Sequence, residues 1–81
     1  MQVQVRFFAA AREATGTTSE ALELPEGATV GDAFVTLASR HPALGALRTQ
    51  LRFAVGSEFA GETEALTGGA TLALIPPVGG G

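Results

Sequence analysis

Residues 29–40 have the sequence TVGDAFVTLASR, which is the clearest structural signal in the chain. Apolar side chains recur in it at every third or fourth residue: Val30, Ala33, Phe34, Leu37 and Ala38. Such a stripe is typical of an amphipathic helix that packs on a sheet. Thr29 followed by Asp32 resembles a capping box, which places the start of the helix at Val30. The helix is expected to end just before Pro42, because proline stops a helix.

Strands are predicted on both sides of this helix, where apolar and polar residues alternate. Residues 1–8 alternate strictly, and the apolar face consists of Val3, Val5 and Phe7. The same pattern, or a short apolar run, predicts further strands at residues 20–24, 51–55, 58–60 and 71–75. Gly56-Ser57 is the expected hairpin turn between the strands at residues 51–55 and 58–60.

Two shorter segments complete the chain. Residues 9–15 are rich in helix formers, and Gly16 suits the left-handed position that ends a helix, so a helix of about two turns is expected. Residues 43–50 are expected to form a short helical or irregular link, in which Leu44 and Leu47 cover an edge of the core.

This order of elements predicts a two-layer α+β fold, in which one long helix crosses a mixed sheet of four or five strands. A right-handed crossover would make the first and last strands parallel neighbours at the centre of the sheet. The side chains expected to face the helix are Val3, Val5, Phe7, Leu22, Leu24, Phe53, Val55, Leu72 and Leu74.

Length and composition limit the classes of function. Eighty-one residues are enough for one domain with one core. The net charge is −3 and the five basic side chains are scattered arginines, so neither nucleic acid nor an anionic membrane is an expected partner. The absence of cysteine excludes disulfides and thiolate chemistry, and with a single histidine it argues against a metal site. No apolar run could span a bilayer and no secretion signal opens the chain, so a cytoplasmic location is expected.

His41 is the only histidine. A role as general base would require a serine, cysteine or acidic partner, and no motif places one beside it. At the end of the predicted long helix, its side chain can interact with the helix dipole. We therefore expect the dipole contact.

The chain ends at residues 75–81 with the sequence IPPVGGG. Pro76 and Pro77 are expected to end the last strand, because neither donates a ladder hydrogen bond and each restricts its φ. The residues that follow are Val78, Gly79, Gly80 and Gly81. A glycine run adds nothing by burial, yet it fits a narrow channel and can present a terminal carboxylate to another protein's reactive centre. The sequence therefore predicts a carboxylate on a flexible tether; the alternative is a fraying terminus or a cloning scar.

Two motifs resemble those of a known family. Residues 7–16, FFAAAREATG, resemble the N-terminal signature of the MoaD-type small subunit of molybdopterin synthase. Residues 74–78, LIPPV, together with the closing Gly80-Gly81, resemble its C-terminal signature. The order of predicted elements is similar to the ubiquitin-like β-grasp fold of that family. The resemblance implies a β-grasp domain over residues 1–78 and a flexible tail over residues 79–81.

The resemblance also implies a role as a sulfur carrier. An activating enzyme of the MoeB type would use ATP-Mg²⁺ to adenylate the carboxylate of Gly81, and sulfur would then replace the leaving group to give a thiocarboxylate. The large subunit of molybdopterin synthase, of the MoaE type, would accept the tail, with Gly79 and Gly80 as the thread and Pro76 and Pro77 setting its direction. The sulfur would pass to cyclic pyranopterin monophosphate in molybdenum cofactor biosynthesis. The chain would bind no permanent cofactor and would not be catalytic alone.

Three apolar residues are candidates for partner binding. Phe8 and Ile75 fall on the sheet face away from the predicted core, and Phe59 lies on the short hairpin. We expect them to form an exposed docking patch that the activating enzyme and the large subunit share. The alternative is that a loop or the first short helix covers them.

Two other classes of function compete with this one. The first is a related sulfur carrier for thiazole, tRNA thiolation or cysteine synthesis, or a ubiquitin-like protein modifier that forms isopeptide conjugates with lysines of its targets. The second is a plain β-grasp interaction module whose tail has no chemical role. Removal of Gly80 and Gly81 would leave the activity of such a module unchanged.

Overall fold

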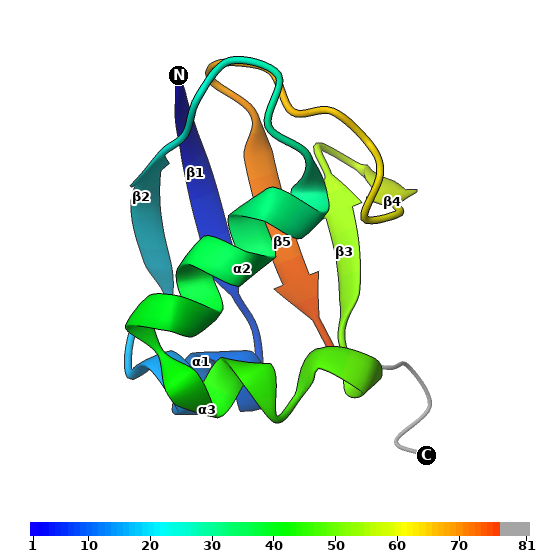
Figure 1. Ribbon diagram of the computed structural model, residues 1–81. Coiled ribbons are helices and arrows are strands. Elements are labelled where there is room, and N and C mark those ends of the chain that lie inside the picture. Colours follow the sequence, from blue (N-terminus) through cyan, green and yellow to red (C-terminus); the bar gives the residue numbers. More distant parts are fainter. Residues whose placement is uncertain (77–81) are drawn as a thin grey trace.

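The computed structural model describes residues 1–76, which form one sheet with its helices (Figure 1). The elements, in chain order, are β1 (Gln2–Phe7), α1 (Ala10–Thr15), β2 (Ser19–Glu23), α2 (Val30–Arg40), α3 (Pro42–Gly45), the 3₁₀ helix η1 (Arg48–Gln50), β3 (Arg52–Val55), β4 (Glu58–Ala60) and β5 (Thr71–Ile75). The predicted α+β class and the predicted order of elements are confirmed. The bounds of β4 and β5 match the prediction, and those of the other strands differ by one residue: β1, for example, ends at Phe7 and leaves Phe8 outside the ladder.

The sheet has five strands in the order β2-β1-β5-β3-β4. The first and last strands, β1 and β5, are parallel neighbours, as the crossover rule predicts. The remaining pairs are antiparallel. The β1–β5 register places Val5 opposite Leu72 and Phe7 opposite Leu74, so the apolar side chains of the two central strands share one face.

Helix α2 covers that apolar face and crosses the sheet diagonally (Figure 1). Its start is the predicted capping box: the Thr29 Oγ1 accepts a hydrogen bond from the backbone N–H of Asp32, and the Asp32 carboxylate accepts one from the backbone N–H of Thr29. The buried residues of the helix are Val30, Ala33, Phe34 and Leu37. They are the apolar stripe that identified the helix in the sequence, apart from Ala38, which is half-buried.

The core contains the predicted sheet residues with one exception. Val55 is half-buried, because β3 ends there and the chain turns at Gly56, whose φ of 63° is left-handed. No polar or charged residue among residues 1–76 is buried.

Helices α1 and α3 contact each other at the end of the sheet where β1 and β5 finish (Figure 1). Gly16 ends α1 in the left-handed conformation, with a φ of 75°, as its position in the sequence predicts. The predicted link between α2 and β3 consists of α3 and η1. Leu44 in this link is fully buried and Leu47 packs against the core, so both cover the core as expected.

Candidate functional site

Within residues 1–76, one face of the sheet has no helix over it, because α2 lies on the other face (Figure 1). Side chains alternate between the faces along a strand, so the residues between the core positions point to this open face. On β5 these are Thr71, Ala73 and Ile75, and on β3 they are Arg52 and Ala54.

The open face carries a shallow depression of about 300 Å³. Its lining residues are Phe8, Ala54, Gly56, Ser57, Phe59, Ala73 and Ile75. All three residues predicted for partner binding are therefore brought together in one place, although they come from different parts of the chain. The side chain of Phe8 is 41% exposed and that of Phe59 is 63% exposed, while Ile75 is half-buried. Within residues 1–76, neither a loop nor α1 covers them.

Small side chains form the floor of this depression. Ala54 lies directly opposite Ala73 on one side and opposite Phe59 on the other. Two facing alanines leave a hollow between larger side chains on the adjoining positions. These alanines were not predicted from the sequence, because they meet only through the pairing of β3 with β5.

Two arginines that were not predicted from the sequence lie beside aromatic rings of the depression. The Cζ of Arg6 is 5.7 Å from the centroid of the Phe8 ring, and the Cζ of Arg52 is 5.7 Å from the centroid of the Phe59 ring. Both distances are within the range of cation–π attraction. Each exposed aromatic ring of the depression therefore has a guanidinium group beside it.

The depression is adjacent to the point where the chain leaves the sheet. Ile75 is the last residue of β5, and the half-buried Pro76 follows it outside the ladder, as predicted. The other predicted tail residues lie outside the described residues: Pro77, Val78, Gly79, Gly80 and Gly81. Their proposed chemical roles remain predictions.

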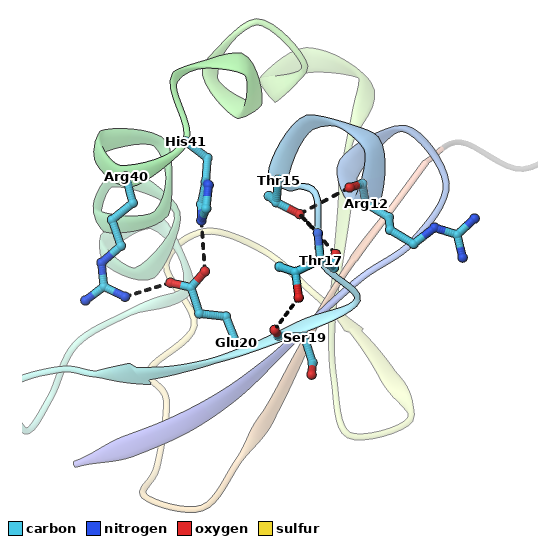
Figure 2. A network of polar contacts seen from close by, with 7 residues as sticks. All are labelled: Arg12, Thr15, Thr17, Ser19, Glu20, Arg40 and His41. Carbon is cyan, nitrogen blue, oxygen red and sulfur yellow. Dashed lines mark hydrogen bonds and ion pairs between the residues drawn. The ribbon is translucent and has the colours of Figure 1, made fainter.

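A cluster of charged and polar residues lies on the helix side of the sheet, away from the depression (Figure 2). Glu20 on β2 accepts a hydrogen bond from Arg40 Nη1 at 2.6 Å through one carboxylate oxygen, and its other oxygen is 2.8 Å from His41 Nε2. Burial raises the pKa of Glu20, but the hydrogen bonds and positive charge of His41 and Arg40 outweigh it, so the pKa lies below its ordinary value. The cluster joins the end of α2 to the edge strand β2.

This cluster corrects the sequence-based view of His41. The backbone N–H of His41 donates to the carbonyl of Leu37 in the last turn of α2. The imidazole ring, which was expected to interact with the helix dipole, instead has an acidic partner, Glu20, which no motif predicted. The ring also lies edge-on to Phe7, with 6.2 Å between ring centroids. These contacts hold the end of α2 on the sheet. No group of three or more potential metal ligands occurs within residues 1–76, and no helix there is long and apolar enough to cross a membrane.

Comparisons with known proteins cover the whole chain. The sequence profile of the ThiS family matches residues 5–81. The molybdopterin synthase sulfur carrier subunit of Chlamydomonas reinhardtii is 36% identical over an alignment that covers 100% of both chains. Its counterpart in Homo sapiens is 35% identical and covers 99% of this chain and 94% of that one. The Small archaeal modifier protein 1 of Haloferax volcanii is 36% identical over 94% of this chain and 97% of that one.

Solved structures agree with these relatives. The crystal structure of the H. volcanii modifier superposes with a TM-score of 0.88, at 32% identity and with 100% of both chains covered. A ubiquitin from Caldiarchaeum subterraneum has a TM-score of 0.66 at 20% identity, covers 100% of this chain and 98% of that one, and shares the fold. The predicted ubiquitin-like β-grasp fold is therefore confirmed.

Two similar structures are complexes. One is the BexX/CysO complex of Amycolatopsis orientalis, in which the matching chain is 28% identical with a TM-score of 0.73, covering 98% of this chain and 99% of that one. The other is the complex of subunits 1 and 2 of the molybdopterin-converting factor from Helicobacter pylori. Its matching chain shares the fold, with a TM-score of 0.72, 20% identity and 100% of both chains covered. A profile match over almost the whole chain and full-length relatives above 30% identity lead to one conclusion: the chain belongs to the ThiS family of ubiquitin-like sulfur carriers.

Proposed function

We propose that this chain is the sulfur carrier subunit of molybdopterin synthase and that the carboxylate of Gly81 carries the sulfur. The observation that carries the proposal is the full-length identity to sulfur carrier subunits, 36% to that of C. reinhardtii and 35% to that of H. sapiens. The family match also runs through Gly81, so the segment that would do the chemistry is part of the resemblance.

The chemistry proceeds in two steps on one carbon atom. The Gly81 carboxylate attacks the α-phosphate of ATP, pyrophosphate leaves, and an acyl-adenylate forms; the activation is needed because a free carboxylate is a poor electrophile. Hydrosulfide then attacks the acyl carbon, a C–S bond forms and AMP leaves. The product is a thiocarboxylate, and one oxygen of the original carboxylate leaves with AMP. In this mechanism the ATP-Mg²⁺ belongs to the activating enzyme.

The depression on the open sheet face is the proposed docking surface for both partners, the activating enzyme and the large subunit. It supplies an exposed apolar centre formed by Phe8, Phe59 and Ile75. Its place beside Pro76 supports this role, because a partner bound there receives the tail directly. Structurally similar chains from A. orientalis and H. pylori occur in complexes with another protein, which supports a partner-dependent function here.

The experiment that tests the proposal is intact mass spectrometry of the chain before and after incubation with the activating enzyme, ATP-Mg²⁺ and a sulfur donor. We expect a mass gain equal to one sulfur atom less one oxygen atom, and no gain in a variant without Gly81. Addition of the large subunit and cyclic pyranopterin monophosphate should then restore the original mass. An unchanged mass with an activating enzyme that is active on another carrier would contradict the proposal.

A second candidate is a protein modifier, favoured by the 36% identity to the archaeal modifier. Both functions begin with adenylation of the terminal carboxylate, but a modifier transfers its acyl carbon to a lysine amine of the target. Mass spectrometry of cell extracts separates the two, because a modifier leaves its C-terminal peptide on target lysines after proteolysis; the last trypsin site is Arg52, so that peptide would be residues 53–81. Such attached peptides, lost when Gly81 is deleted, would favour the modifier.

A further inference from the structure

The arginines beside the docking depression occupy matched positions. Arg6 on β1 lies opposite Ala73 of β5, and Arg52 on β3 lies opposite Ile75 of the same strand. They therefore flank β5 from its two sides on the open face of the sheet. Neither arginine lines the depression, but the Cζ of each is 5.7 Å from the centroid of an aromatic ring that does, Phe8 for Arg6 and Phe59 for Arg52.

Neither arginine of this pair forms an ion pair with the described part of the chain. Within residues 1–76 the ion pairs involve other residues: Met1 with Glu23, Arg40 and His41 with Glu20, and Arg48 with Glu62. No residue that lines the depression is acidic. In a chain whose net charge is −3, two arginines without an ion pair thus lie beside a depression whose lining has no acidic residue.

The aromatic rings also limit how the guanidinium groups move. An arginine side chain loses considerable rotamer freedom when it forms an ion pair, and stacking on a ring fixes part of that geometry beforehand. A guanidinium within cation–π distance of a ring can still donate two parallel hydrogen bonds to a carboxylate. Arg6 and Arg52 are therefore arranged to receive carboxylates on either side of an apolar contact.

We propose that the docking partner presents an apolar side chain that fills the depression, with carboxylate groups on both sides that pair with Arg6 and Arg52. We call these two residues the arginine pair. This inference rests on the proposed function, in which the partner is the large subunit of molybdopterin synthase. The depression, of about 300 Å³, holds the apolar contact that keeps the complex together, and the arginine pair attracts and orients the partner.

Such a division of roles has a kinetic signature. Charges at the rim of an interface act mainly on the association rate and make it depend on salt, whereas apolar contacts at the centre act mainly on dissociation. At physiological ionic strength the screening length is about 8 Å, so the attraction survives in part and disappears at high salt. Partner association should therefore slow as salt rises.

The test is stopped-flow or biosensor kinetics of binding to the large subunit from the same organism, with the double variant Arg6→Gln/Arg52→Gln. At about 50 mM salt we expect its association rate constant to be about tenfold lower than that of the unmodified chain, and the two should converge at about 500 mM salt. The dissociation rate constant should change less. The variant Arg6→Lys/Arg52→Lys keeps the charge and should retain most of the salt dependence.

The control matches the change in net charge at a distance from the open face. Val35→Glu/Ala43→Glu also lowers the net charge by two, at exposed positions of α2 and α3, and should leave the association rate within about twofold. Association of the unmodified chain that does not depend on salt, or an arginine double variant that behaves like this control, would overturn the arginine pair. Intact mass separates that result from failure of the proposed function, because thiocarboxylate formation on the unmodified chain would still be seen.

Discussion

Arg52 lies directly opposite Ile75 in the antiparallel ladder between β3 and β5, on the sheet face that α2 leaves open. Ile75 is the last residue of its strand, so this pair stands at the base of the proposed tail. A partner that grips the depression there also determines where the following residues are delivered. The docking surface and the carrier segment are consequently linked through one short strand end.

The variant Ile75→Asp should lose binding to the large subunit. It puts a carboxylate into the apolar centre of the depression and beside Arg52, so it removes the apolar contact and occupies one of the two guanidinium groups. Central apolar anchors of interfaces contribute about 2 kcal/mol or more, so the dissociation constant should rise by about thirtyfold or more. Isothermal titration calorimetry with the large subunit measures the change.

Val35→Asp is the matched control for this variant. Val35 is an apolar residue on α2 whose side chain is 69% exposed, on the other side of the sheet from the depression. It should leave the affinity within about twofold. If Ile75→Asp remains folded by circular dichroism and binds as tightly as the control, the depression is not the docking surface.

The three apolar residues of the depression could be predicted from the sequence, Phe8 and Ile75 from their positions in predicted strands and Phe59 from its place on the short hairpin. Phe8 is an aromatic residue at the polar position of an alternating strand, and Ile75 continues a strand past its core residues. The floor and the arginine pair could not be predicted in the same way. Ala54, Ala73, Arg6 and Arg52 fit their strands without any irregularity, and their proximity depends on the register between β1, β5 and β3.

Substitution of Glu20 should reveal a pH-dependent part of the stability. The pKa of Glu20 lies below its ordinary value of 4.5 in the folded chain, so its contribution is complete above that value and is lost as the pH falls through the folded-state pKa. Glu20→Gln should therefore lower the free energy of unfolding by about 1 kcal/mol near pH 7 and by much less near pH 2.5. Urea denaturation at both pH values measures the difference.

Glu26→Gln provides the comparison, since Glu26 is an exposed residue of the turn before α2. Its effect should be within about 0.5 kcal/mol at either pH. A destabilisation by Glu20→Gln that is equally large at low and neutral pH would show that the charge of Glu20 does not contribute.

The Glu20–His41 contact also marks the limit of local patterns. The two residues are 21 positions apart, on an edge strand and at the end of α2, and they meet only when the helix has packed on the sheet. Sequence spacing identified the helix end at which His41 lies, because caps and prolines act within a few residues. It contained no information about which edge strand that helix end would reach.

The capping box of α2 should contribute to stability as a coupled pair. Thr29→Ala removes the hydrogen bond from the side chain to the Asp32 N–H, which is 3.2 Å long, and should cost about 1 kcal/mol of unfolding free energy. Asp32→Ala removes the reciprocal bond, and the double variant should cost less than the sum of the two because the residues interact. Thr49→Ala, at an exposed position of η1, is the control. Strict additivity in urea denaturation would contradict the coupling.

Ala9 has a left-handed backbone conformation that glycine would adopt at lower cost. Its φ of 49° and ψ of −120° make it the only non-glycine residue with positive φ among residues 1–76, between β1 and α1. The strain costs about 1–3 kcal/mol, whereas glycine costs about 0.5–1 kcal/mol through the freedom of the unfolded chain. Ala9→Gly should therefore stabilise the protein by about 1 kcal/mol and raise Tm by about 4–8 °C in thermal denaturation. Ala10→Gly, one residue later and within α1, is the control and should lower the free energy of unfolding by about 0.5–1 kcal/mol. If both variants lower the free energy of unfolding equally, Ala9 is not strained.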